Sequence, residues 1–163
     1  MALKIRIFPD PVLRKISQPV KKMDAKLERF IQELGKFMAA QPGGIGIAAP
    51  QVGVLKRIAI VDLTLKIPVS RRLLLINPVI EEAGDFTVTR EGCMSVPHFT
   101  ANANRASRIR VSWLDESFTR QELVTAGLEA VCIQHEVDHL NGMLFLDRVS
   151  CLNSDIFRRK KYL

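Results

Sequence analysis

The chain has 163 residues, of which 47% are hydrophobic and 25% are charged, and its formal net charge is +7. This length suits one compact domain with its own core, and the composition excludes disordered and fibrous classes. Three cysteines, an odd number, argue against a disulfide framework and favour reduced thiols. No apolar stretch approaches the ~20 residues that cross a bilayer, and no signal peptide is visible. We therefore expect a single domain over residues 1–163, located in the cytoplasm without a membrane partner.

Part of the positive charge lies in short groups: Lys21–Lys22, Arg71–Arg72 and Arg158–Lys161. Aromatic residues do not alternate with these groups, and no phosphate-binding glycine loop accompanies them. A solvated basic surface is therefore favoured over a defined nucleic-acid site.

The first predicted element is an amphipathic helix over residues 24–40. Its apolar residues recur at helical spacing and form one stripe: Leu27, Phe30, Ile31, Leu34, Phe37 and Met38. Asp24 is placed to cap the N-terminus, and Pro42-Gly43-Gly44 is expected to end the helix.

Short apolar runs at 57–63 and 73–76 are typical of buried strands, and Asn77-Pro78 is expected to close the second one. Residues 108–113 alternate strictly, which predicts a half-exposed strand. Its expected buried side chains are Ile109, Val111 and Trp113, opposite Arg108, Arg110 and Ser112.

A turn at 115–118 should lead into a partner strand near 120–124, followed by a second helix over 126–140 with Gly142 at its C-terminal cap. Strands flanked by two helices favour an α+β fold over alternating βαβ units. We expect largely antiparallel or mixed β-sheets packed around the second helix.

The second helix contains His135-Glu136-Val137-Asp138-His139, an H-E-x-x-H pattern. Residues four apart share a helical face, so both imidazoles can reach one metal ion, and Glu136 can take a proton from metal-bound water. Two core histidines satisfied by hydrogen bonds are the alternative. Because a mostly buried helix with two histidines and two acids is unstable unless these groups are paired or coordinated, a metal-dependent hydrolase is favoured.

A third ligand is sought upstream, because only 24 residues follow His139 and they include no histidine or glutamate. The segment Glu91–Ser95 offers Cys93 beside a glycine, where the backbone can approach a ligand. Free cysteines are more often small buried hydrophobes, and this is our interpretation of Cys132 and Cys151. His98 is interpreted as an ordinary surface residue.

A glycine-rich segment covers residues 43–53. It lacks the G-x-G-x-x-G spacing of dinucleotide sites, and no strand precedes it. Taken alone, this segment indicates no more than a loop that leaves the first helix.

Together, three segments closely resemble the signatures of peptide deformylases. These are G-φ-G-φ-A-A-x-Q at Gly44–Gln51, E-G-C-φ-S at Glu91–Ser95 and H-E-x-D-H at His135–His139. All three are complete and follow the family's order along nearly the whole chain. The resemblance implies an enzyme that removes the formyl group from the N-terminal methionine of new proteins, with formyl-Met nascent polypeptides as substrates.

The resemblance also implies roles for individual residues. Three side chains would bind the metal, with water in the fourth position: Cys93, His135 and His139. Glu136 would act first as general base and then as general acid. The side-chain amide of Gln51 and the backbone N–H of Met94 would stabilise the oxyanion, and the loss of one such donor typically costs ~3 kcal/mol.

Substrate binding follows from the same motifs. The backbone of Gly44, Ile45 and Gly46 would pair with the peptide as an added strand, and Gly92 is a further candidate for substrate binding. The methionine side chain would enter an apolar pocket, whose candidate lining residues are Ile45, Leu128, Val131 and Cys132.

Glu91 and Asp138 are expected to support the metal ligands, with Arg105 as the cationic partner that buried carboxylates require. Cysteine, two histidines and water would ordinarily suggest zinc. The resemblance instead implies Fe²⁺, with Zn²⁺, Ni²⁺ or Co²⁺ able to substitute.

The segment His98–Asn104 departs from the family pattern, because it lacks the basic residue and the proline that many relatives carry before the arginine matched by Arg105. The region after Cys151 is also short, so ribosome association through Arg158–Lys161 is a secondary hypothesis.

Two other function classes compete with this prediction. A metallopeptidase of another clan would take its third ligand after His139. A non-enzymatic, metal-stabilised protein that binds nascent chains or ribosomes would fit if a motif residue were lost, yet Gln51, Cys93 and Glu136 are all present.

Overall fold

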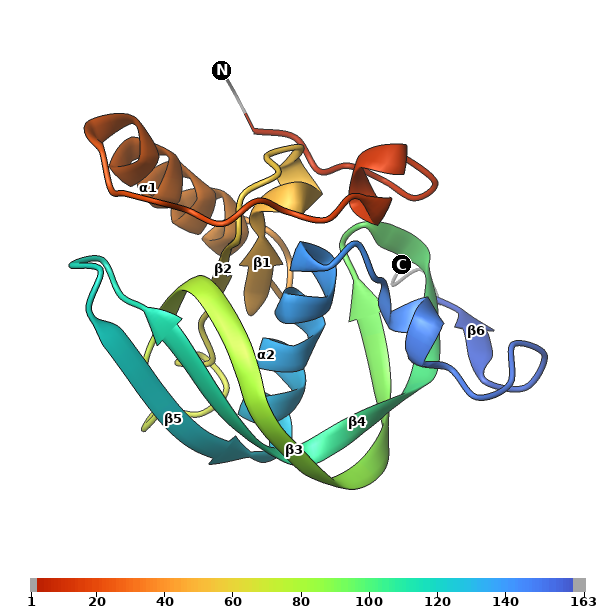
Figure 1. Cartoon of the computed structure of the whole chain (residues 1–163). Coiled ribbons are helices and arrows are strands. Elements are labelled where there is room, and N and C mark those ends of the chain that lie inside the picture. The colour runs from red at the N-terminus through yellow and green to blue at the C-terminus, as the bar shows by residue number, and fades with distance from the viewer. Residues whose placement is uncertain (1–2, 160–163) are drawn as a thin grey trace.

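The computed structural model describes residues 3–159 and shows one antiparallel sheet wrapped around a helix (Figure 1). The helical elements are η1 (Pro11–Arg14), α1 (Ala25–Ala39), η2 (Ala49–Val52), α2 (Gly127–Leu140) and η3 (Phe145–Arg148), where η marks a short 3-10 helix. The strands are β1 (Gly46–Ala48), β2 (Ile58–Val61), β3 (Leu73–Cys93), β4 (Val96–Leu114), β5 (Arg120–Ala126) and β6 (Ile156–Arg158).

The sheet order is β1-β2-β3-β4-β5, with β6 added to β4, and every paired strand is antiparallel. Figure 1 shows β3 and β4 as a long curved pair that surrounds α2. The predicted α+β class, with an antiparallel sheet around the second helix, is confirmed. Within the described residues, no helix has the length and apolar character needed to cross a membrane.

Helix α1 forms as its sequence predicts. The Asp24 side chain accepts a hydrogen bond from the Leu27 N–H at 2.8 Å, which caps the N-terminus. Its buried face packs on one side of β2, against Ile58 and Ile60. The alternate residues Ala59 and Val61 face α2 instead. Strand β2 is therefore buried on both faces, which explains its continuous apolar run.

Helix α2 is buried around nearly its whole circumference from Ala130 to Leu140, with only His135 partly exposed among those residues. It packs inside the curve of the sheet, against β1, β2 and β4. Gly142 follows the helix with a φ of 70°, the left-handed conformation expected of a C-terminal cap. The helix can therefore carry polar groups into the middle of the protein.

The prediction that Asn77-Pro78 closes a strand is wrong, because β3 continues through both residues to Cys93. A register shift lies between Ile76 and Val79, and Asn77 has a φ of 50°. This bulge occurs where β3 changes its partner from β2 to β4. The turn-forming residues are accommodated by a change of direction and do not end the strand.

Two predictions about single side chains are also wrong. Ser112 is buried, although its position in the alternation suggested exposure, and its hydroxyl donates to Glu81 Oε1 at 2.5 Å. Cys151 is exposed, whereas we expected a buried thiol. It lies at the start of the turn region that follows η3 and is not part of the neighbouring core cluster.

Candidate metal centre

Cys93, at the C-terminal end of β3, lies beside two histidines of α2. One ligand atom from each of Cys93, His135 and His139 lies within 4.8 Å of the other two, and Cys93 Sγ is 3.3 Å from His139 Nε2. Cys93 and His139 are buried, and the His135 side chain is 12% exposed. The three predicted ligands are therefore together, on a strand end and one turn of a helix.

Electrostatic interactions among these groups favour a positive charge at their centre, which a metal cation would supply in place of the imidazole proton. Burial raises the pKa of the Cys93 thiol, but the positive potential of His139 and hydrogen bonds from both imidazoles outweigh it and hold the pKa well below 9.0. Burial lowers the pKa of His135, but its bonds to Cys93 and Glu91 raise it well above 6.5. A thiolate next to two imidazoles is a donor set that Zn²⁺ and Fe²⁺ both accept, so these residues fit a divalent transition metal.

Glu136 lies on α2 next to His135 and is buried, and its Oε2 has no hydrogen-bond partner among residues 3–159. Burial raises its pKa to about 7, although the charges of both histidines lower it. A Cβ atom at Gly46 would collide with the Glu136 carboxylate, so only glycine leaves room for it beside β1. A carboxyl group with this pKa can both accept and release a proton near neutral pH.

Gln51 reaches the centre from η2 with a defined amide orientation. Its Oε1 accepts the Ala48 N–H at 2.9 Å, so its amide nitrogen must face the other way. That Nε2 lies 3.4 Å from Cys93 Sγ and 3.3 Å from Ser95 Oγ. Gln51 therefore presents N–H donors to the metal centre.

Behind the ligands lies a network of buried charges. His135 Nδ1 donates to Glu91 Oε2 at 2.7 Å, which leaves Nε2 to face the centre. Arg105, only 1% exposed, donates to both oxygens of Glu91 at 2.7 and 3.1 Å and to Asp138 Oδ2 at 2.5 Å. Burial alone would raise the pKa of Glu91, but the hydrogen bonds from His135 and Arg105 lower it to about 2.

One member of this network was not predicted from the sequence. Arg148, on η3, donates to Asp138 Oδ1 at 2.7 Å and to Asp138 Oδ2 at 3.0 Å. An arginine in a short 3-10 helix belongs to no periodic pattern, so nothing in the sequence marks it. Asp138 thus receives two guanidinium groups, and the buried acids Glu91 and Asp138 are both paired with cations.

A cleft of about 260 Å³ opens onto the metal centre. All seven residues predicted to bind substrate line it: Gly44, Ile45, Gly46, Gly92, Leu128, Val131 and Cys132. Met94 lines it as well. Burial raises the pKa of Cys132 to about 12, so this wall of the cleft stays uncharged. Lys66 and Arg90 also line the cleft, and neither was singled out from the sequence.

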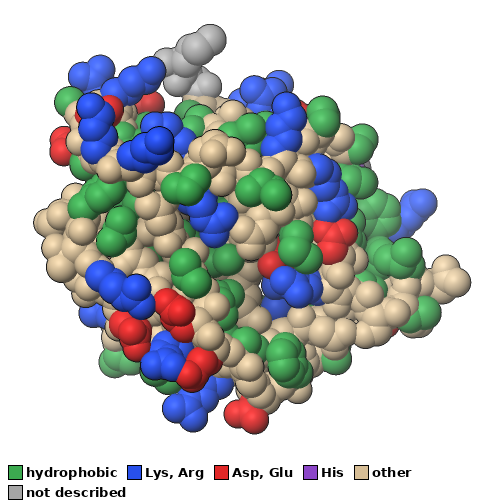
Figure 2. All heavy atoms as spheres, viewed as in Figure 1, with side chains coloured by type: hydrophobic (Ala, Val, Ile, Leu, Met, Phe, Trp, Pro, Cys, Tyr) green, Lys and Arg blue, Asp and Glu red, His purple; other side chains and the backbone are tan. Residues whose placement is uncertain are grey.

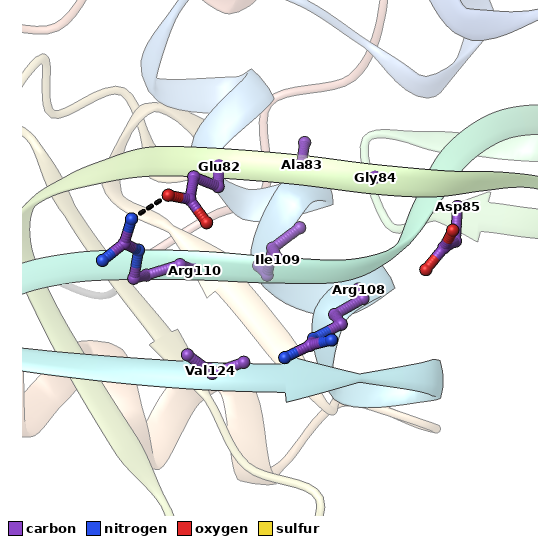
Figure 3. Close-up of a pocket in the computed structure, with 8 residues that line it drawn as sticks. All are labelled: Glu82, Ala83, Gly84, Asp85, Arg108, Ile109, Arg110 and Val124. Carbon is purple, nitrogen blue, oxygen red and sulfur yellow. Dashed lines mark hydrogen bonds and ion pairs between the residues drawn. The ribbon is translucent and has the colours of Figure 1, made fainter.

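Another hollow lies on the outer surface of the sheet, away from these residues (Figure 3). There Glu82 pairs with Arg110, and Arg108 and Val124 complete the rim. None of the predicted site residues lines it. On the molecular face shown in Figure 2, lysines and arginines form several separate groups among acidic and apolar side chains.

Comparison with known proteins agrees with this geometry. The family model described as "Polypeptide deformylase" matches residues 2–155. The chain is 41% identical over 155 residues to the peptide deformylase of Rhizobium meliloti (strain 1021), covering 94% of this chain and 88% of that protein. The chain belongs to the peptide deformylase family. The peptide deformylase of Azotobacter vinelandii (strain DJ) is 44% identical, with 97% and 93% of the two chains covered.

A solved structure extends the agreement from sequence to fold. The crystal structure of peptide deformylase from Thermotoga maritima matches with a TM-score of 0.85 at 37% identity, covering 93% of this chain and 99% of that one. As a member of the peptide deformylase family, the protein is a hydrolase that removes the N-terminal formyl group from nascent polypeptides. The two competing classes, a metallopeptidase of another clan and a non-enzymatic relative, are not supported.

Proposed function

We propose that this deformylase works through one divalent metal ion held by Cys93, His135 and His139, with Glu136 as the proton-transferring group. The observation that carries the proposal is the compact cluster of three ligand atoms beside a buried carboxylate oxygen that has no partner within residues 3–159. We propose Fe²⁺ as the native metal, with Zn²⁺, Ni²⁺ or Co²⁺ able to substitute. When bound, the metal supplies Lewis-acid activation of a water molecule at neutral pH.

Formyl-Met polypeptides would bind in the cleft as an added strand. In the described residues β1 pairs only with β2, so its other edge is available to the backbone of a peptide beside Gly44, Ile45 and Gly46. Gly92 would line the opposite side of the peptide. The methionine side chain would occupy the apolar part of the cleft, which is formed by Ile45, Leu128, Val131 and Cys132.

Glu136 would move the proton during hydrolysis. It takes a proton from the attacking water as the new C–O bond forms at the formyl carbon. It then delivers this proton to the amide nitrogen as the C–N bond breaks, which releases formate and a free methionine amino group. The pKa of about 7 suits both halves of this transfer.

Gln51 and Met94 would stabilise the negative charge that develops on the formyl oxygen. The fixed orientation of the Gln51 amide supports this role, because its N–H donors do not need to reorganise during the reaction. The backbone N–H of Met94 would be the second donor. Behind them, Glu91, Arg105 and Asp138 would hold His135 in place.

We further propose that residues 1–163 form a single catalytic domain that acts in the cytoplasm, without a membrane partner or a defined nucleic-acid site. Weak ribosome association would use the basic residues Arg158–Lys161. Lys160 and Lys161 lie outside the described residues.

Formate release from a formyl-Met peptide tests the proposal, using protein purified without oxygen and assayed for bound metal. We expect about one metal ion per chain and formate production in the native protein. Cys93→Ser should lose most of the metal and the activity, whereas His98→Ala should lose neither, because His98 is exposed and is not a predicted ligand. Normal metal content and turnover in Cys93→Ser would contradict the proposed ligand set.

A further inference from the structure

Two arginines lie along the outer lip of the cleft, beside the strand β6. Arg90 lines the cleft itself, and its guanidinium carbon lies 3.5 Å from the ring centroid of Phe157 in β6. Its Nε donates to Asn102 Oδ1 at 3.0 Å, and its Nη1 donates to Thr100 Oγ1 at 3.4 Å. Stacking and two neutral hydrogen bonds therefore hold the cation in place and leave its charge unneutralised.

The second arginine, Arg159, follows β6 and lies against Gly92. A Cβ atom at Gly92 would collide with the Arg159 guanidinium, and the Arg159 backbone N–H donates to the carbonyl of His98 at 2.9 Å. Gly92 is adjacent to the ligand Cys93 and lines the cleft. The segment that follows β6 thus places a positive charge directly over the path proposed for the substrate.

These charges have no acidic partner in the structure of residues 3–159. Neither Arg90 nor Arg159 forms an ion pair there, and neither does Lys66, a third cation lining the cleft. The acids that line the cleft are Glu91, which is already paired with Arg105, and Glu136, which is buried at the metal centre. The outer lip therefore carries an excess of positive charge.

The alternation of side chains along β3 shows which part of a substrate this charge would meet. Glu91 and Cys93 point into the protein, so Arg90 and Gly92 face outward. A peptide bound as a strand alternates in the same way. If its methionine points into the pocket, its second residue points outward, towards the face that carries Arg90 and Arg159.

We propose that Arg90 and Arg159 form a specificity site that favours a carboxylate on the residue following formyl-methionine. The ligand class is therefore formylated polypeptides with Asp or Glu in the second position. This inference rests on the proposed function of the same cleft. Phe157 is a positioning residue, because it contacts the Arg90 side chain and does not line the cleft.

The test compares kcat/KM for C-terminally amidated formyl-Met tripeptides that carry Asp, Asn or Lys in the second position. A further peptide carries Asp in the third position only. We expect kcat/KM to be higher for the Asp peptide than for the Lys peptide by about two- to fivefold per arginine, as for exposed ion pairs. This difference in kcat/KM should shrink in high salt. Asp in the third position should give no advantage. Formyl-Met-Ala with a free or an amidated C-terminus separates recognition of a side chain from recognition of the terminal carboxylate.

Arg90→Gln and Arg159→Gln should each reduce the Asp-to-Lys ratio, and the double variant should bring it close to one. Phe157→Leu should reduce it partly. Arg108→Gln is the matched control, an exposed arginine that does not line this cleft, and should keep the full ratio. Equal rates for Asp and Lys peptides in the native protein, or an unchanged ratio in the double variant, would overturn the inference.

Binding of the same peptides to Glu136→Ala separates the two proposals. Failure of the native protein to release formate from any peptide would overturn the proposed function. Tighter binding of the Asp peptide to Glu136→Ala would still support the specificity site. Formate release with equal binding of all the peptides would overturn the specificity site alone.

Discussion

Glu91 and Glu136 are both buried and both lie beside His135, yet their surroundings differ in the cations they contact. Glu91 receives hydrogen bonds from Arg105 and His135, and its pKa is about 2. Glu136 has one oxygen with no partner among the described residues, and its pKa is about 7. Residue type and burial are the same, so the neighbouring donors decide whether the carboxylate stays ionised or exchanges protons.

The same contrast divides the two sides of the metal centre. On one side is the support network, which consists of Glu91, Arg105, Asp138 and Arg148. Its members are paired, and it fixes the orientation of His135. On the cleft side, Glu136 has a carboxylate oxygen without a partner among the described residues, and the amide nitrogen of Gln51 makes only long contacts, 3.4 Å to Cys93 Sγ and 3.3 Å to Ser95 Oγ. We infer that the paired side positions the ligands and the unpaired side carries out the reaction.

Removing the central cation of the support network should have the largest effect on stability. Arg105→Leu would leave two buried carboxylates without this partner, so the free energy of unfolding should fall by about 3–5 kcal/mol. Urea denaturation of the metal-loaded wild type and variant measures this change in the free energy of unfolding. A loss below about 1 kcal/mol would mean that the network is less dependent on pairing than its geometry suggests.

Removing a donor on the cleft side should act mainly on catalysis, with a smaller loss of about 1–3 kcal/mol in unfolding free energy because the buried Ala48 N–H also loses its acceptor. Gln51→Leu should lower kcat by about 10²–10³ with little change in KM, because the amide acts on charge that exists only in the transition state. Gln32→Leu, at an exposed position of α1, is the matched control and should retain full activity. A Gln51→Leu variant whose main defect is in KM would assign the residue to ground-state binding.

The low pKa of Glu91 makes the support network sensitive to acid. Because the pKa is lower in the folded protein than the ordinary 4.5, the ionised group stabilises the fold above that pH and this stabilisation is lost as the pH falls towards 2. Glu91→Gln should remove this dependence. Between about pH 6 and pH 3, the difference in unfolding free energy between wild type and variant should shrink by on the order of 2 kcal/mol. A constant difference would contradict the pairing.

The smallest effect is expected at the exposed edge of the network. The Arg148 side chain is 41% exposed, and Asp138 keeps Arg105 when Arg148 is replaced. Arg148→Gln should therefore reduce the unfolding free energy by about 1 kcal/mol or less, with metal content unchanged. A loss as large as that in Arg105→Leu would show that the two arginines act as one unit.

Local patterns predicted the parts of the molecule that local sequence determines. The Asp24 cap and the apolar stripe specify α1, and the spacing of His135 and His139 places two imidazoles on one helical face. The short motif around Cys93 supplied the third ligand candidate. These features depend on residues within a few positions of one another, so a single sequence carries them.

Features that depend on tertiary structure were missed. The middle of the β3–β4 pair has polar residues on both faces, for example Glu81 and Glu82, so it shows no alternation. The side chain of Asn77, a residue typical of turns, forms two hydrogen bonds of 2.8 Å with the backbone of Val20. These two residues are 57 positions apart in the sequence. The positions of Arg90 and Arg148 likewise depend on distant contacts that leave no periodic signal: Arg90 stacks on Phe157 of β6, and Arg148 donates to Asp138 of α2.

The most direct test of the division between positioning and chemistry is the Glu136→Gln variant, measured for both metal content and formate release from a formyl-Met peptide. The substitution keeps the size of the side chain and removes its ability to take a proton. We expect a normal metal content, because the three proposed ligands and their support network are intact, and a fall in kcat of about 10²–10⁴. Turnover close to that of the native protein, in a variant with full metal content, would contradict it.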